Sequence, residues 1–157
     1  MSGSIRGLMR CALAALAVAT FVACSNGGGG SPEDVVKTYL AAWQAHDYAK
    51  AYPLLTKYMQ QDLSKEAWAT EQEAIFKIAE VQIFSFQTFP AKVEGEKAVV
   101  PNLLKSKDKF INQLGKNEYE LYTLVKDQDG AWRIDKQELV ESDGVAKWFP
   151  ENVREDR

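Results

Sequence analysis

The sequence predicts an α+β domain in which three helices come first and an antiparallel sheet follows. Apolar residues recur at helical spacing from residue 32 to about residue 79, and the pattern then changes to strand-like alternation up to residue 139. Within the alternating region, Asp129-Gly130 is typical of a hairpin turn. Helices and strands that stand in separate blocks indicate the α+β class.

The first helix has the clearest start. Ser31 suits the N-cap, Pro32 suits the first turn, and Glu33 with Asp34 complements the positive end of the helix dipole. The helix is expected over residues 32–46. Its apolar face is expected to contain Val35, Val36, Tyr39, Leu40 and Trp43.

Two further helices are expected before the sheet. Asp47 can cap a helix over residues 48–55, in which Pro53 limits regularity. Ser64 can cap a third helix that runs to about residue 79. The inward side chains of this third helix are expected to be Trp68, Ile75, Ile78 and Ala79.

The first strands follow this third helix. Residues 81–89 predict a strand with bulky side chains on both faces, Phe84 and Phe86 sharing one of them. A second strand is expected over residues 96–104, where Pro101 favours an edge or a bulge. Residues 105–116 are polar with isolated apolar residues, which indicates a loop or a hairpin end.

The last two strands are expected over residues 118–127 and 131–139. With a two-residue turn between them, Asp127 faces Trp132 across the hairpin. The register decides which side chains share a face, because successive residues of a strand point to opposite faces.

A charged tail, residues 141–157, ends the chain. Its only apolar cluster is Trp148-Phe149-Pro150. This cluster is expected to dock on the domain, and the last residues are expected to fray.

Residues 1–23 have the pattern of a secretory signal peptide. Arg6 and Arg10 precede an uncharged, almost wholly apolar run that ends at residue 24. The run is shorter than the roughly 20 residues that a membrane-spanning helix needs. It therefore indicates a targeting segment that takes no part in the fold.

The residues before Cys24 resemble the lipobox of bacterial lipoproteins. Phe21, Val22 and Ala23 occupy the three positions before the cysteine, and a small residue directly before it is the key feature of the motif. The resemblance implies cleavage before Cys24 and diacylation of its thiol; an ordinary secreted protein with a free thiol is the alternative. Residues 24–30 would then be the lipidated cysteine and a flexible glycine-rich tether.

Charge and composition narrow the classes of function. Without residues 1–23, the chain carries 17 basic and 22 acidic residues. A mildly acidic domain without a basic stripe is a poor candidate for nucleic acid binding, and it has little overall attraction to anionic lipid. One histidine and no remaining free thiol predict no metal site, no disulfide and no cofactor.

Residues 31–140 resemble the nuclear transport factor 2-like superfamily. The resemblance rests on the long first helix ending in Trp43, on HDYAKAYPLL at residues 46–55, and on LVKDQDGAWRID at residues 124–135. It implies a strongly bent antiparallel sheet that wraps around the helices as a cone with an apolar cavity. More narrowly, the chain is similar to small bacterial lipoproteins of this fold that have no assigned activity.

Seven aromatic side chains are candidates for the lining of that cavity, because aromatic groups commonly line ligand pockets. They are Tyr39, Trp43, Trp68, Phe84, Phe86, Tyr122 and Trp132. The alternative is that they fill the core, which is expected for at least half of them.

Catalytic candidates are few. The resemblance includes ketosteroid isomerases, scytalone dehydratases and polyketide cyclases, which place an Asp or a His in the cavity as an acid or base. His46 and Asp47 are adjacent at a helix junction, where a polar corner capped by Asp47 is the simpler interpretation. Asp135 is the strand carboxylate that the predicted register places beside Leu124, although a solvated position is the alternative.

These observations favour a non-catalytic binding or interaction module, anchored through Cys24, that holds a small apolar ligand or an envelope protein. The alternatives are an isomerase- or dehydratase-like enzyme with a cavity carboxylate, and an accessory domain whose pocket is unused. Relatives also suggest a homodimer through the sheet. Because Ser25 is not acidic, the lipoprotein resemblance implies the periplasmic face of the outer membrane in a Gram-negative host.

Overall fold

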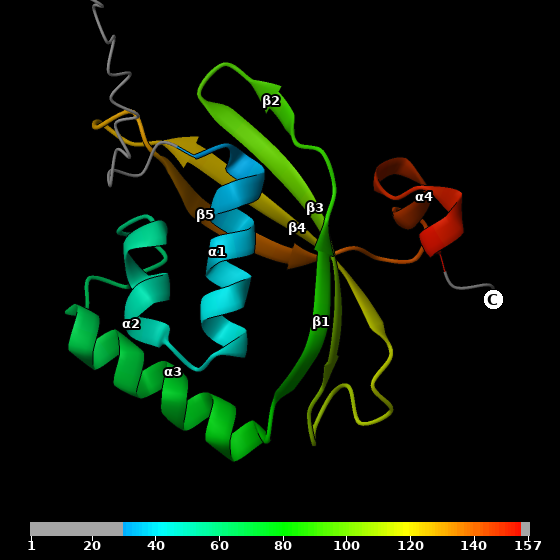
Figure 1. The fold of residues 1–157 in the computed structure, drawn as a ribbon, viewed down its shortest axis with the longest axis horizontal. Helices are drawn as coiled ribbons and strands as arrows, with labels where there is room; N and C mark the ends of the chain where they lie inside the picture. The colour runs from blue at the N-terminus through cyan, green and yellow to red at the C-terminus, as the bar shows by residue number, and fades with distance from the viewer. Residues whose placement is uncertain (1–29, 155–157) are drawn as a thin grey trace, which may run out of the picture.

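The computed structural model describes residues 30–154, in which the three N-terminal helices pack on one face of an antiparallel sheet (Figure 1). The strand order is β1-β3-β4-β5, and β2 pairs with β3 beside β1. The expected α+β order of three N-terminal helices and a bent antiparallel sheet is confirmed. The signal peptide and the Cys24 tether predicted above lie outside the described residues.

Helix α1 spans Pro32–Gln44 and begins with a complete capping box. The Ser31 hydroxyl accepts the Asp34 N–H at 3.2 Å, and the Asp34 carboxylate accepts the Ser31 N–H at 3.3 Å. Helix α2 covers only Tyr48–Ala51 and continues as a 3-10 turn, Tyr52–Leu54. The expected single helix over residues 48–55 is thus divided just before Pro53.

Helix α3 spans Lys65–Ala79 and is capped by Ser64 as predicted. Its inward face differs from the prediction, because Ile75 and Ile78 are exposed. Phe76 points inward instead and packs on Trp43, with ring centroids 4.6 Å apart. Phe76 also meets the Tyr48 ring edge-on, with centroids 5.6 Å apart.

The sheet consists of β1 (Gln82–Thr88), β2 (Lys92–Glu94), β3 (Lys97–Lys107), β4 (Asn117–Lys126) and β5 (Trp132–Leu139). Pro101 lies inside the central strand β3, between the segment paired with β1 and the segment paired with β2. Its carbonyl accepts the Phe89 N–H at 2.9 Å where those two strands meet. The predicted edge or bulge at Pro101 is therefore wrong, because β3 has neighbours on both sides; the proline is accommodated where the pairing with β1 ends and the pairing with β2 begins.

Two irregularities change the predicted faces of the strands. A register shift between Ile83 and Ser85 leaves Phe84 unpaired in β1, so that Phe84 turns outward and is half exposed. The second irregularity is in the β4–β5 hairpin, where the turn has three residues and not two: the Asp127 N–H donates to the Ala131 carbonyl. Gly130, at φ +77°, supplies the left-handed residue that such a turn needs.

This turn shifts the predicted hairpin register by one residue. Lys126, not Asp127, faces Trp132, and Leu124 pairs with Ile134. A second shift beyond Leu124 leaves Asp135 as the extra residue of a bulge. The inward face of β4 is therefore that of Tyr122 and Leu124, both fully buried.

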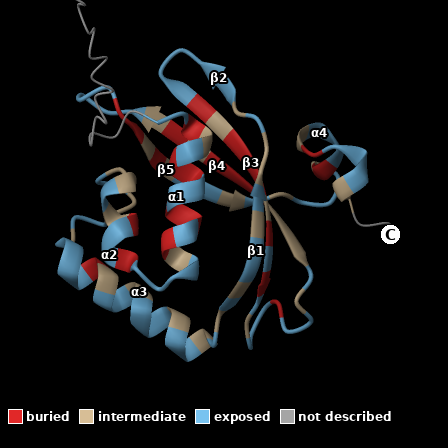
Figure 2. Cartoon of the chain, viewed as in Figure 1, coloured by how far each residue is buried: buried red, intermediate tan, exposed pale blue. Residues whose placement is uncertain are grey.

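The core lies between α1 and the concave face of the sheet, where the buried residues concentrate (Figure 2). The tail forms α4 (Val145–Trp148) and a 3-10 turn (Glu151–Val153) on the opposite side of the sheet from α1 (Figure 1). Phe149 is 2% exposed and makes edge contacts with Phe89 and Tyr119. The apolar cluster of the tail thus docks on the outer sheet face.

We expect Phe149→Ala to lower the free energy of unfolding by about 3 kcal/mol, because it empties the contact that holds the tail on the sheet. Urea titration followed by circular dichroism measures the change. Asn152→Ala, an exposed position in the same segment, is the control and should unfold at the wild-type midpoint. An unchanged midpoint for Phe149→Ala would mean that the tail does not stabilise the domain.

Candidate functional site

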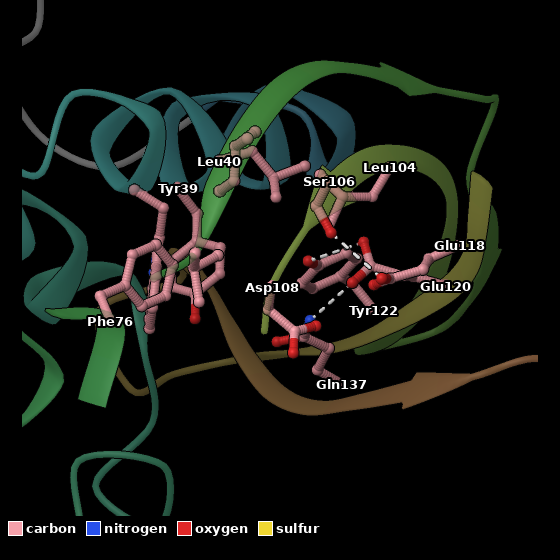
Figure 3. A pocket seen from close by; sticks show the side chains of 13 residues that line it. Tyr39, Leu40, Phe76, Leu104, Ser106, Asp108, Glu118, Glu120, Tyr122 and Gln137 are labelled. Atoms are coloured by element: carbon pink, nitrogen blue, oxygen red, sulfur yellow. Dashed lines mark hydrogen bonds between the residues drawn. The ribbon is translucent and has the colours of Figure 1, made fainter. Parts of the chain in front are cut away.

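A cavity of about 260 Å³ lies between the C-terminal half of α1, the end of α3 and the far ends of β3 and β4 (Figure 3). Helix α1 and the segment from α3 into β1 supply an aromatic and aliphatic wall. The strands supply most of the polar groups. The lining residues are Tyr39, Leu40, Trp43, Phe76, Val81, Ile83, Leu104, Ser106, Asp108, Glu118, Glu120, Tyr122 and Gln137.

Local periodicity explains why these side chains converge. Glu118, Glu120 and Tyr122 stand two residues apart on β4, so all three point to the concave face. On α1, Tyr39 and Trp43 are four residues apart and share one helix face. Their rings lie 5.6 Å apart, and Tyr39 also meets the Tyr122 ring edge-on at 6.0 Å.

Glu120 is the most deeply buried carboxylate of the site, with 1% of its surface exposed. One carboxylate oxygen accepts the Asn102 amide at 2.8 Å and the Tyr122 hydroxyl at 3.1 Å, and the other accepts the Gln137 amide at 2.8 Å. Burial raises the pKa of Glu120, although these three hydrogen bonds oppose the rise. No lysine, arginine or histidine lines the cavity in the described part of the chain.

The Glu118 carboxylate is the second acceptor on this strand. It accepts the Ser106 hydroxyl at 3.0 Å and the Asn112 amide at 2.5 Å. Asp108, at the rim, accepts three backbone N–H groups of the following loop, and these hydrogen bonds hold the pKa of Asp108 below its usual range. The cavity is thus negatively charged at its polar end.

The two tyrosines stay protonated at any physiological pH. Burial, reinforced by the Glu120 carboxylate, raises the pKa of Tyr122 well above its ordinary value. The same two causes raise the pKa of Tyr39. Beside them, the buried Asn102 Oδ1 has no hydrogen-bond donor within residues 30–154.

The predicted pocket residues occupy different places. Tyr39, Trp43 and Tyr122 line the cavity. Trp68 and Trp132 are buried in the core and do not line it. Two residues lie elsewhere: Phe86 packs against the core and borders a separate shallow hollow beside α1, and Phe84 is half exposed because of the bulge in β1.

None of the predicted catalytic candidates lines the cavity. His46 ends α1 in a left-handed conformation (φ +56°), and its Nδ1 lies 3.0 Å from the Tyr48 hydroxyl. Asp47 caps α2 by accepting the Lys50 N–H at 3.2 Å. Asp135 accepts the Thr56 hydroxyl at 2.9 Å beside the sheet edge. The structure therefore does not bring these three residues together.

Sequence reasoning missed the residues that form the polar end of the cavity. The predicted register singles out Asp135, although Glu120 also lies in the strand expected over residues 118–127. The period of two in β4 was the available signal, because Glu118, Glu120 and Tyr122 must share a face wherever the hairpin turn lies. Ser106 and Asp108 belonged to a segment expected to be a loop, whereas β3 continues to Lys107.

Comparisons with known proteins identify the fold. No protein-family model matches the sequence, and no curated protein matches it. The chain is similar to the solved structure of a ketosteroid isomerase-like protein from Erwinia carotovora (15% identity, TM-score 0.50), covering 69% of this chain and 93% of that one. The fold is nuclear transport factor 2-like.

Two further solved structures share this fold at 12% identity. A SEC-C motif containing protein from Rhodopseudomonas palustris has a TM-score of 0.53, with 71% of this chain and 80% of that chain covered. Bd1075 from Bdellovibrio bacteriovorus has a TM-score of 0.50 over 68% of this chain. The match spans only 39% of Bd1075. At these identities the likeness concerns the fold alone.

The raised pKa of Glu120 predicts a pH dependence of stability. The unfolded chain loses this proton near the ordinary carboxyl pKa, whereas the folded protein keeps it to higher pH. The contribution of Glu120 to stability therefore falls as pH rises from that ordinary value through the raised folded pKa. We expect Glu120→Gln to flatten the curve in this window, as measured by thermal melting from mildly acidic to neutral pH.

Glu94→Gln, at an exposed position on β2, is the matched control and should leave the profile unchanged in this window. The same fall in melting temperature for Glu120→Gln as for the wild type would show that another group is responsible.

Proposed function

We propose that this protein is a membrane-anchored lipoprotein of the bacterial cell envelope whose domain binds a small ligand in the cavity without converting it. The cavity itself is the main support for this proposal, because its aromatic wall faces a buried Glu120 that three side chains hold in place by hydrogen bonds. Pockets of this kind, apolar with a few fixed polar groups, are the usual form of small-molecule sites.

The size and charge of the cavity limit the ligand. At about 260 Å³ it is slightly smaller than typical drug-sized pockets, so the ligand is small. Glu118, Glu120 and Asp108 at the polar end disfavour an anionic ligand such as a fatty acid. A neutral or cationic molecule, with an apolar part against Trp43 and a hydrogen-bond donor toward Glu120, fits both ends.

Existing hydrogen bonds favour binding over catalysis. A general base must take up a proton, and the three hydrogen bonds that Glu120 accepts stabilise its ionised form. Its Oε1 accepts only the Gln137 amide, which leaves this oxygen an acceptor site for a ligand donor. An oxyanion site needs a free donor, and the Tyr122 hydroxyl donates to Glu120. These contacts orient Glu120 as a fixed acceptor.

An isomerase- or dehydratase-like enzyme is the second candidate. Glu120, with a raised pKa in a cavity with an apolar wall, has the environment of a general base. The likeness to the ketosteroid isomerase-like protein from Erwinia carotovora adds a fold-level analogy. In that case the ligand would be a substrate, and it would not be recovered unchanged.

The anchoring part of the proposal rests on the lipobox-like residues before Cys24. Diacylation gives stable membrane attachment, which a single acyl chain does not. In Gram-negative lipoproteins, an acidic residue close after the lipidated cysteine is linked to retention in the inner membrane. Residue 25 is a neutral serine, which supports the periplasmic face of the outer membrane in such a host. None of the helices within residues 30–154 is long and apolar enough to cross a membrane.

The resemblance also suggested a homodimer through the sheet or an envelope protein partner. The tail segment with Phe149 covers part of the outer sheet face. A dimer through the sheet would therefore use the part of that face that the tail leaves free.

Ligand binding can be tested by filling the cavity. We expect native mass spectrometry of the protein, purified from the cells that naturally make it, to show a bound small molecule. Ile83→Trp places an indole in the cavity and should remove that mass, whereas Val93→Trp on the exposed strand β2 should retain it. The proposal fails if the ligand persists in Ile83→Trp, or if incubation converts it to a product.

Anchoring can be tested with the two cysteines of the chain. We expect Cys24→Ser to abolish incorporation of labelled palmitate and to release the protein from membranes. Cys11→Ser is the matched control and should be labelled like the wild type, because residue 11 lies within the signal segment. Continued labelling of Cys24→Ser would contradict the lipoprotein assignment.

A further inference from the structure

The β3–β4 loop, residues 108–116, presents large apolar side chains to solvent. Phe110 is 60% exposed, Ile111 90% and Leu114 83%. We call these three residues the apolar tip. Beside it, Phe84 reaches to 4.0 Å of the Cβ position of Gly115, and its own exposure of 50% extends the apolar surface. Exposed apolar side chains that gather on one loop mark a contact site more often than scattered single residues do.

The exposure of the apolar tip comes from a well-defined loop. Asp108 accepts the backbone N–H groups of Phe110, Ile111 and Asn112 at 2.6–2.9 Å. The Asn112 side chain, only 8% exposed, holds the other end of the loop: it accepts the Lys116 N–H and donates to the Lys116 carbonyl, both at 2.8 Å. With both ends of the loop fixed, the apolar tip is held outward.

Positive charge is concentrated on the same part of the chain. Lys105, Lys107, Lys109 and Lys116 are all exposed, and Asp108 is the only acidic residue between positions 105 and 116. Lys109 is paired with Glu80 of α3's C-cap at 3.2 Å, so the other three lysines carry the exposed positive charge. The rest of residues 31–157 carries 13 basic and 21 acidic residues. This segment is therefore locally basic in an acidic domain: its lysines are exposed, whereas Glu118 faces the cavity behind them. The weak overall attraction to anionic lipid does not hold for these exposed lysines.

We propose that the apolar tip and its flanking lysines dock on an anionic lipid bilayer. Apolar side chains enter the interfacial region while lysines attract anionic headgroups, and the two contributions add. A protein partner fits less well, because a standard interface covers about 800 Å² on each partner, which one narrow loop does not offer. A bilayer accepts a protruding loop without a complementary groove.

The position of the loop has a geometric consequence. It lies at the opposite end of the domain from the start of α1, where the proposed tether joins (Figure 1). Contact with the membrane that holds the anchor would therefore lay the strands along the bilayer. Docking on lipid does not depend on acylation, so it can be tested without the anchor.

The test uses residues 31–157, which contain every helix, strand and core side chain that the structure describes. Co-sedimentation is measured with vesicles of phosphatidylglycerol and phosphatidylcholine in equal parts, and with pure phosphatidylcholine vesicles. We expect binding to the anionic vesicles only, with weakening by salt. No binding to the anionic vesicles, or equal binding to both kinds, would overturn the proposal.

Variants separate the two contributions. Ile111→Ser combined with Leu114→Ser should weaken binding to the anionic vesicles by about tenfold or more. Tyr58→Ser, at an 81% exposed position away from the loop, is the matched control and should bind like the wild type. Melting temperatures of all variants should match the wild type, because the substituted side chains contact solvent. Equal binding by the tip variant would overturn the proposal.

The lysines are tested in the same way. Lys107→Gln combined with Lys116→Gln should weaken binding about tenfold. Lys57→Gln combined with Lys97→Gln removes the same charge from exposed positions elsewhere and should have a much smaller effect. Equal effects of the two pairs would attribute the attraction to overall charge and overturn the assignment to this loop.

Insertion itself has a direct readout, because residues 31–157 contain no cysteine. An environment-sensitive fluorophore on Ile111→Cys should shift to the blue with anionic vesicles, whereas the same fluorophore on Tyr58→Cys should not. Binding without a shift at position 111 would show that the apolar tip stays in water, which contradicts the proposal.

Discussion

The site depends on how far α1 covers the concave face of the sheet. A helix of 13 residues is about 20 Å long, whereas the 11-residue strand β3 extends over roughly 36 Å. Helix α1 therefore packs over only part of β3 and β4. Inward side chains beyond that part, such as Ser106 and Glu118, face the cavity between the helix and the bent sheet. The same uncovered end of the hairpin carries the exposed apolar tip.

Burial of a carboxylate at this place requires partners, and neighbouring strands supply them. Asn102 on β3 pairs with Glu120 across the ladder, and Gln137 on β5 pairs with Tyr122, two residues further along β4. All three partners donate to Glu120, which compensates part of the desolvation cost without a basic residue. The result is a rigid acceptor at the polar end of an aromatic cavity, a suitable arrangement for selective binding of a small hydrogen-bond donor.

The order of the elements could be predicted because its signals are local. The helix starts at Ser31 and Ser64 follow from capping chemistry, and both are confirmed. The irregular positions could not be predicted, because a bulge depends on the pairing of two strands. Phe84 is the extra residue of the irregularity in β1, and its side chain therefore points outward. Asp135 is the extra residue of the bulge in β5, and its carboxylate accepts the Thr56 hydroxyl. The spacing of two residues between Glu120 and Tyr122 is enough to predict that both side chains point to the same face of the sheet. That α1 covers this face follows only from the tertiary packing.

A crystal structure of the protein purified from the cells that naturally make it tests the central claim most directly. The account predicts electron density for a small non-protein molecule between Trp43 and Glu120, with its polar group toward the carboxylate. A cavity closed by collapse of the Tyr39, Trp43 and Phe76 side chains onto the strands, with no room for a ligand, would contradict it.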